Sequence, residues 1–147
     1  LWLDYHDTVN VLVEAPGQPG HYSIFEQTKY GLEGRSSSAV VGGICELGET
    51  PSVTAQREVQ EEMGLVCRTL HFLGRFRTDV NRGAGWNSSF LATDCAPKQQ
   101  GGTTFDNSNQ HSIGDLDMER QDLQIVSRED LRQRLRDGKF LEVKWSA

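Results

Sequence analysis

Residues 43–65 constrain this chain more than any other part of it, and they read GICELGETPSVTAQREVQEEMGL. Thr50 is a good helix N-cap, and Pro51 suits the first helical position because its missing N–H forms no bond there. Gly64 is a typical C-terminal stop. The pattern therefore predicts a helix over residues 51–63.

The acidic residues of this helix share one face. At about 100° per residue, Glu58, Glu61 and Glu62 fall within roughly 100° of one another. The apolar residues lie on the opposite side; they are Val53, Ala55, Val59 and Met63. Like charges three and four residues apart repel, whereas hard cations such as Mg²⁺ prefer carboxylate and phosphate oxygens. The pattern favours a Mg²⁺ site, or a Mn²⁺ site, over a merely solvated acidic face.

The same stretch resembles the Nudix box, the signature of hydrolases that cleave diphosphate linkages. Its fixed positions are Gly43, Glu49, Arg57, Glu58, Glu61, Glu62 and Gly64, with aliphatic residues at Val59 and Leu65. The resemblance implies a metal-dependent pyrophosphohydrolase with an α+β fold, an α/β/α sandwich around a mixed central sheet. We expect residues 1–147 to form one such domain. The chain begins without Met, so we also expect it to be a trimmed part of a longer protein.

The resemblance also assigns roles outside the three glutamates. Arg57 points away from the acidic face by helical geometry, and the family pairs this arginine with Glu49, which clamps the loop against the helix. The carbonyl just before the box glycine is a metal ligand in related proteins, which implies Gly42 here. Gly42 and Gly43 let the backbone approach metal and phosphate closely.

The general base of such enzymes varies in position. It is either a glutamate of the box, Glu61 or Glu62 here, or an acidic residue on a late loop. Asp115, Asp117 and Glu119 precede the last predicted strand, and Glu119 is our first choice among them.

Five further residues are candidates for substrate contacts. Arg75, Arg77 and Arg82 are placed to meet phosphate, and Trp86 to stack on a base. Phe25 is a candidate for lining the pocket. Packing in the core is the alternative for both aromatic residues.

The segments FEQTKYG and SREDLRQRLRDGKF resemble the nucleotide-sugar branch of the family, typified by ADP-ribose pyrophosphatases. We therefore expect a small nucleotide substrate, a nucleoside diphosphate linked to a group such as a sugar. One alternative is a pyrophosphohydrolase that removes pyrophosphate or the cap from the 5′ end of RNA. Another is a nucleotide-binding regulatory subunit of an RNA-processing complex. Besides the small nucleotide, we consider a protein partner or a homodimer, and RNA only under the alternatives. The net charge of −6 disfavours binding to long RNA.

Composition bears on the cellular compartment in which the chain works. The three cysteines, Cys45, Cys67 and Cys95, match no zinc spacing and predict reduced thiols in an intracellular compartment. That compartment is the cytoplasm, or an organelle matrix if a targeting segment has been removed. No apolar run approaches the roughly 20 residues that span a bilayer, so we expect no membrane partner.

Periodicity and turn residues predict the remaining elements. We expect strands over residues 8–14, 22–30, 39–41, 66–77, 86–93 and 122–126, a helix over 128–137, and polar loops over 31–38 and 97–114.

Overall fold

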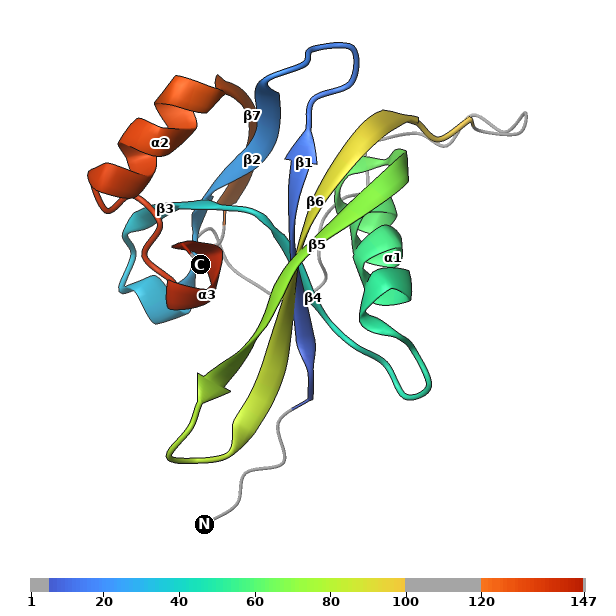
Figure 1. Cartoon of the computed structure of the whole chain (residues 1–147). Helices are drawn as coiled ribbons and strands as arrows, with labels where there is room; N and C mark the ends of the chain where they lie inside the picture. Colours follow the sequence, from blue (N-terminus) through green and yellow to red (C-terminus); the bar gives the residue numbers. More distant parts are fainter. Residues whose placement is uncertain (1–5, 100–119, 147) are drawn as a thin grey trace.

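The computed structural model describes residues 6–99 and 120–146 (Figure 1). Within these described residues, seven strands form one sheet in the order β3-β2-β1-β6-β5, with β4 paired to β1 and β7 paired to β2. The strands are β1 (Thr8–Glu14), β2 (His21–Thr28), β3 (Ser36–Ala39), β4 (Val41–Ile44), β5 (Leu65–Asp79), β6 (Ala84–Pro97) and β7 (Arg120–Ser127). The pairing of β1 with β6 is parallel and the other pairings are antiparallel, so the sheet is mixed.

Helices cover both faces of this sheet. One face carries α1 (Pro51–Met63), and the other carries α2 (Arg128–Arg136) and α3 (Val143–Ser146) (Figure 1). A short 3-10 helix, η1 (Tyr30–Leu32), follows β2. This arrangement confirms the predicted α+β sandwich with a mixed central sheet. No helix within residues 6–99 and 120–146 has the length and apolar character needed to cross a membrane.

The central strand β1 separates two cores by simple alternation. Val9, Val11 and Val13 are buried with α1 residues in one core. Leu12 points to the opposite face and packs against the second core, which contains Phe140 of the C-terminal segment. Side chains of a strand alternate between faces, so β1 contributes to both layers at once.

The helix α1 has the bounds that its caps predict. The Thr50 hydroxyl accepts a hydrogen bond from the Val53 amide, and Gly64 adopts the left-handed conformation with φ 67°. Ala55 and Val59 are buried as expected, whereas the side chain of Val53 is half exposed. The packed side of the helix is therefore narrower than predicted.

The polar stretch 31–38 is not all loop, because β3 begins at Ser36. Ser37 and Ser38 are buried. The C-terminal segment satisfies their polar groups: the Lys139 carbonyl accepts from the Ser38 amide at 2.9 Å and from the Ser37 hydroxyl at 3.2 Å. Serine-rich sequence is compatible with a buried strand here because a distant segment supplies its hydrogen bonds.

The cysteines differ from the prediction of three reduced thiols. Cys67 of β5 and Cys95 of β6 form a disulfide, and Cys45 is free. The two bonded cysteines are register partners in the antiparallel pair. Their separation of 28 residues hides this pairing in the sequence. The expectation of an intracellular compartment loses the support that it took from reduced thiols.

Candidate active site

A single arginine ties the loop after β4 to the helix α1. Arg57 donates from Nε to Glu49 Oε1 at 2.9 Å and from Nη2 to Glu49 Oε2 at 3.0 Å. Its Nη2 also donates to the carbonyl of Ile44 at 3.1 Å. The structure thus contains the bidentate pair that the sequence suggested, and the same guanidinium reaches the end of β4.

Glu49 accepts two further hydrogen bonds, one from the loop before α1 and one from the helix itself. The Thr54 hydroxyl donates to Glu49 Oε2 at 2.8 Å, and the Glu46 amide donates to the same oxygen at 3.1 Å. The hydrogen bond from Arg57, followed by those from Glu46 and Thr54, lowers the pKa of Glu49 to about 2. Glu49 therefore stays ionised at all ordinary pH values. The contribution of the buried Thr54 was not anticipated, because nothing marks this position in the sequence.

Glu58 lies directly against the backbone of β4. A Cβ added to Gly43 would come within 2.1 Å of Glu58 Cδ, so only glycine leaves room for this carboxylate. Arg57 Nη1 donates to Glu58 Oε1 at 2.8 Å. Burial raises the pKa of Glu58, and Arg57 opposes the shift.

Glu61 and Glu62 complete the acidic side of α1. Arg57 Nη1 also donates to Glu61 Oε2 at 3.3 Å, and the Glu61 side chain is largely exposed. Glu62 is exposed as well, yet desolvation raises its pKa to about 7, with Glu58 and Glu61 adding to the shift and Lys29 opposing it.

Two features of this acidic side depart from the sequence analysis. Arg57 does not point away from the acidic face, because it donates to two of its three glutamates. Lys29, which follows β2, acts electrostatically on Glu62. Its only signal in the sequence was its place in the FEQTKYG segment.

The acidic side suits a hard cation by its chemistry. Three carboxylates supply oxygen ligands, and the space that Gly43 leaves holds one of them against β4. Gly42, whose carbonyl was the fourth candidate ligand, directly precedes Gly43 in β4. Among the described residues, no three acidic, His or Cys side chains converge on one point as they stand. Glu58 and Glu61 are instead both paired with Arg57.

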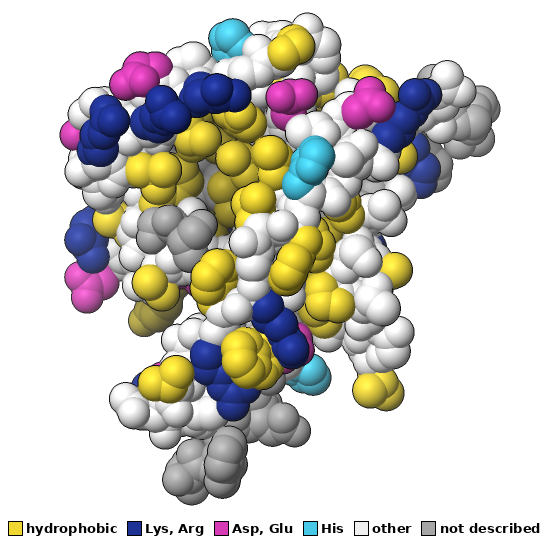
Figure 2. Space-filling model, viewed as in Figure 1, with side chains coloured by type: hydrophobic (Ala, Val, Ile, Leu, Met, Phe, Trp, Pro, Cys, Tyr) yellow, Lys and Arg dark blue, Asp and Glu magenta, His cyan; other side chains and the backbone are white. Residues whose placement is uncertain are grey.

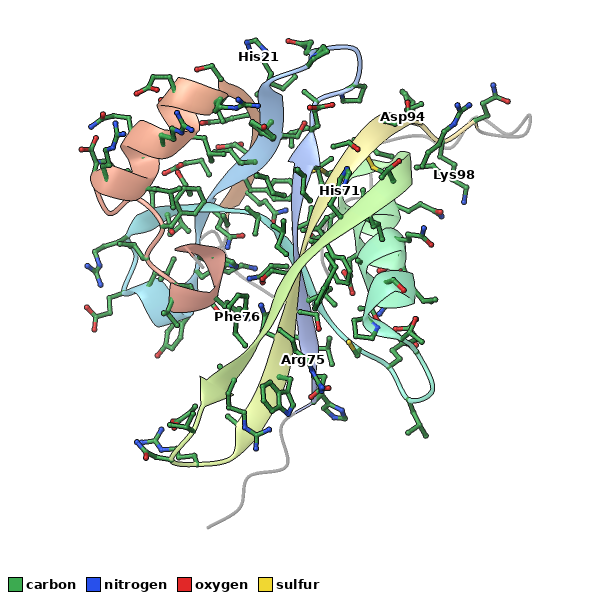
Figure 3. All side chains as sticks on the ribbon, viewed as in Figure 1. His21, His71, Arg75, Phe76, Asp94 and Lys98 are labelled. Carbon is green, nitrogen blue, oxygen red and sulfur yellow. A yellow bond between two sulfur atoms is a disulfide. The ribbon has the colours of Figure 1, made fainter. Side chains whose placement is uncertain are left out.

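The candidate substrate residues of the β5–β6 hairpin form a stack of their own. The guanidinium carbons of Arg75 and Arg77 lie 4.7 Å and 5.0 Å from the ring centroid of Trp86. Asp7 anchors this stack: its carboxylate accepts from Arg75 Nη2 at 3.1 Å and from the Trp86 amide at 3.0 Å. Figure 3 shows Arg75 on this hairpin, away from the helix α1.

The stack and the glutamates lie on opposite sides of β1. Residues 8–11 of β1 pair with β4 along one edge and with β6 along the other. Glu58 contacts β4, whereas Trp86 belongs to β6. Within the described part of the chain, no hydrogen bond or ion pair joins the stack to Glu58, Glu61 or Glu62. The structure therefore does not gather the predicted substrate residues into one pocket.

The other candidates fall elsewhere. Arg82 is exposed in the hairpin turn, where its Nε lies 3.7 Å from Asp79 Oδ2. Phe25 is 4% exposed and packs in the core with Val9 and Val59, so it is a core residue rather than a lining of the pocket. Glu119 lies outside the described residues.

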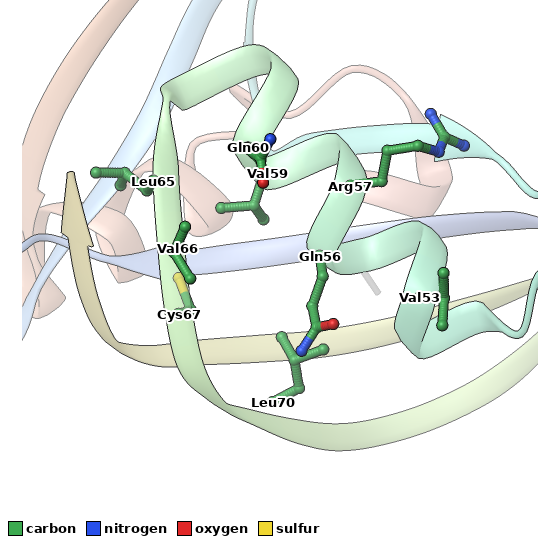
Figure 4. A pocket seen from close by; sticks show the side chains of 9 residues that line it. All are labelled: Val53, Gln56, Arg57, Val59, Gln60, Leu65, Val66, Cys67 and Leu70. Atoms are coloured by element: carbon green, nitrogen blue, oxygen red, sulfur yellow. The ribbon is translucent and has the colours of Figure 1, made fainter. Parts of the chain in front are cut away.

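A cavity of about 320 Å³ lies on the other flank of α1, between the helix and β5 (Figure 4). Its lining is apolar or amide-bearing apart from Arg57, whose side chain points away from Gln56 and Leu70 in Figure 4. No acidic side chain lines it. This groove therefore lacks the carboxylates that metal and phosphate chemistry requires.

Comparisons with known proteins agree with this geometry. A family model described as NUDIX domain matches residues 4–145. A solved structure described as "Crystal structure of ADP compounds hydrolase" is similar, with a TM-score of 0.73 and 17% identity, over 98% of this chain and 68% of that chain. At this identity the likeness shows a shared fold. A search of curated proteins found no match.

Proposed function

The chain belongs to the Nudix family, and on that premise we propose that it hydrolyses the diphosphate linkage of a nucleoside diphosphate joined to a further group, such as a sugar. The prediction of a Nudix pyrophosphohydrolase agrees with the family match. The observation that carries the proposal is the fit of the Glu58 carboxylate into the space left by Gly43, with Glu61 and Glu62 one helical turn further along.

We assign the metal site to the carboxylates of Glu58, Glu61 and Glu62 and to the carbonyl of Gly42, with Mg²⁺ or Mn²⁺ as the cation. A divalent cation bound there supplies positive charge that neutralises the diphosphate and favours ionisation of the attacking water. Arg57 would lie beside a cation held there, because it donates to Glu58 at 2.8 Å and to Glu61 at 3.3 Å.

The residues around this site have separate tasks. Arg57 and Glu49 fix the loop, and Gly43 fixes the place of Glu58. We keep Glu119 as the proposed general base, with Glu61 and Glu62 as alternatives. A glutamine variant of the true base should abolish the acidic limb of the pH–rate profile, where protonation of the base lowers the rate, and the other variants should retain this limb.

The test is a substrate screen combined with Glu62→Gln. Nucleotide sugars, dinucleotides and nucleoside triphosphates are incubated with and without Mg²⁺. We expect Mg²⁺-dependent hydrolysis of a nucleoside diphosphate derivative, reduced several hundred-fold by Glu62→Gln, which corresponds to about 3–4 kcal/mol of barrier. Glu129→Gln on α2 is the control, because Glu129 is exposed and pairs only with Arg136 at 3.5 Å among the described residues. Near-normal turnover of Glu62→Gln at saturating Mg²⁺ would refute the assignment.

A second candidate substrate is the 5′ end of RNA. The exposed stack of Arg75, Arg77 and Trp86 supports it, because guanidinium and indole groups bind bases and phosphates. The net charge of −6 opposes it, since affinity for a long strand requires clustered basic residues. We expect a nucleoside triphosphate and a triphosphorylated RNA 20-mer to bind with similar affinity at physiological salt. Much tighter binding of the RNA would reverse this ranking.

A further inference from the structure

Thr54 is a fully buried polar residue in the second turn of α1. Its side chain is 0% exposed, although Val53 and Gln56 on the same stretch of helix are exposed. A buried hydroxyl destabilises a fold unless it forms hydrogen bonds. The partners of this hydroxyl therefore indicate its role.

The hydroxyl has two acceptors within reach. Thr54 Oγ1 lies 2.8 Å from Glu49 Oε2 and 3.3 Å from the carbonyl of Thr50. A threonine inside a helix commonly donates to the carbonyl four residues earlier, which is Thr50 here. The carboxylate of Glu49 is closer and carries a charge, and charge-assisted hydrogen bonds are the shorter and stronger ones. The single hydroxyl proton therefore goes to Glu49.

Three donors converge on this one oxygen of Glu49. Besides the Thr54 hydroxyl, they are the Glu46 amide at 3.1 Å and Arg57 Nη2 at 3.0 Å. The amide and the hydroxyl belong to groups with little freedom, because one is backbone and the other is a buried β-branched side chain. Together they fix the direction in which the carboxylate faces Arg57.

The orientation of Arg57 decides where its remaining nitrogen points. The guanidinium is planar and rigid, so holding Nε and Nη2 on Glu49 also sets the position of Nη1. Nη1 donates to Glu58 at 2.8 Å and to Glu61 at 3.3 Å. Hydrogen bonds of 3.0 Å or less thus connect Thr54 to Glu58 through two intervening side chains.

Thr54 has no exposed surface of its own with which to act. Being 0% exposed, it contacts no metal ion or substrate bound at the surface. The acidic side of the helix is turned away from the face shown in Figure 2, where no Asp or Glu of the described residues appears over α1. A substitution of Thr54 therefore changes no charge and no binding surface, and any effect on the metal site passes through Glu49.

We infer that Thr54 is a positioning residue for the metal site of α1. Its hydroxyl fixes the carboxylate of Glu49, and that carboxylate aligns Arg57. Arg57 in turn sets the two glutamates to which it donates. Outer partners that orient ligand side chains influence metal affinity in this way. The inference rests on the proposed function in taking these glutamates to bind a divalent cation.

The test separates positioning from folding by measuring Mn²⁺ affinity and thermal unfolding on the same proteins. Thr54→Val removes the hydroxyl and keeps the β-branched shape. We expect it to weaken Mn²⁺ binding in titration calorimetry about tenfold, as the loss of an outer partner of a metal site does. Thr54→Ser retains the donor and should restore most of the affinity. Thr54→Ala takes the place of the valine variant if that protein does not fold.

Ser37→Ala is the matched control. Ser37 is also 0% exposed, and its hydroxyl donates to the Lys139 carbonyl at 3.2 Å, in β3 rather than in α1. Loss of this buried hydrogen bond should lower the melting temperature and leave Mn²⁺ affinity unchanged. Wild-type affinity in Thr54→Val, or equal losses of affinity in Thr54→Val and Ser37→Ala, overturns the inference.

A second measurement needs no metal. The Nε–H of Arg57 donates to Glu49 Oε1 at 2.9 Å, and its hydrogen exchange is followed by NMR. It should exchange faster in Thr54→Val than in the wild type or in Ser37→Ala. If this difference appears in a chain that binds no Mn²⁺, the proposed function fails and the alignment of Arg57 by Thr54 stands. Equal exchange in all three proteins shows that Thr54 does not align Arg57.

Discussion

Arg57 and Glu49 form a bidentate pair, with Nε to Oε1 at 2.9 Å and Nη2 to Oε2 at 3.0 Å. The remaining Nη1 of the arginine reaches Glu58 at 2.8 Å. One side chain therefore connects the loop before α1 with the acidic side of the helix. The planar guanidinium makes this possible, since its donors diverge in one plane.

Replacing Arg57 by alanine should lower stability and activity together. The loop would lose its attachment to the helix, and Glu58 would lose a partner. A misplacement of about 1 Å in the catalytic groups costs on the order of 100-fold in rate. Steady-state kinetics and thermal unfolding of the same preparation measure both effects.

Arg68→Ala controls for the loss of an arginine. The Arg68 side chain is 84% exposed, and its ion pair with Asp94 is long, at 3.9 Å. This variant should resemble the wild type in both measurements. An unchanged melting temperature of Arg57→Ala with abolished activity would instead indicate that the guanidinium contacts substrate directly.

Gly43→Ala should abolish the metal site while sparing most of the fold. The new Cβ would come within 2.1 Å of Glu58 Cδ, so this carboxylate must leave its place against β4. We expect weaker Mn²⁺ binding by titration calorimetry and a loss of activity that excess metal does not restore. Gly31→Ala is the control, since nothing lies within 4 Å of a Cβ there. Equal Mn²⁺ affinity in both variants would contradict this account.

The lowered pKa of Glu49 predicts that the fold loses stability in acid. Its pKa is about 2 in the folded chain, below the ordinary value of 4.5. A lowered folded pKa adds stability that is fully present above pH 4.5 and is lost as the pH falls toward 2. Between these values the wild type should lose more stability than Glu49→Gln, which does not titrate. Urea unfolding midpoints at pH 6 and pH 3 test this, and parallel losses in the two proteins would argue against it.

Local signals account for the parts of the fold that the sequence predicts well. The helix α1 has its predicted bounds because Thr50 and Gly64 act within a few residues of its ends. By contrast, β3 was missed because its serines find their partners far away, in Lys139 and Arg134. Such tertiary hydrogen bonds leave no trace in periodicity or turn residues.

In the candidate site too, local signals predicted some positions well and left others unpredicted. Helical spacing placed Glu58, Glu61 and Glu62 correctly on one side of α1, since it depends only on neighbours along the chain. Arg75 and Trp86 were predicted to contact the substrate of the same site. The parallel pairing of β1 with β6 instead places the two on the far side of β1, and strand order across a sheet is not encoded locally.

The disulfide between Cys67 and Cys95 gives a prediction about stability. It closes a loop across 28 residues of separation that contains the whole β5–β6 turn. Restricting a loop of this length in the unfolded chain stabilises the fold by about 3–4 kcal/mol. Reduction should therefore lower the free energy of unfolding by up to this amount.

The measurement uses Cys45→Ser as the background, because Cys45 is the free thiol that would otherwise exchange with the bonded pair. Urea unfolding with and without dithiothreitol should show a lower midpoint in the reduced sample. In the triple variant that also carries Cys67→Ser and Cys95→Ser, dithiothreitol should have no effect, and its midpoint should match that of the reduced background.

The helix α1 ends beside this bond, since the Lys98 amide of the segment after β6 donates to the Gly64 carbonyl at 2.9 Å. Reduction should therefore also increase hydrogen exchange in the last turn of α1. Two titratable thiols in the unreduced, denatured background protein would show that the bond does not form.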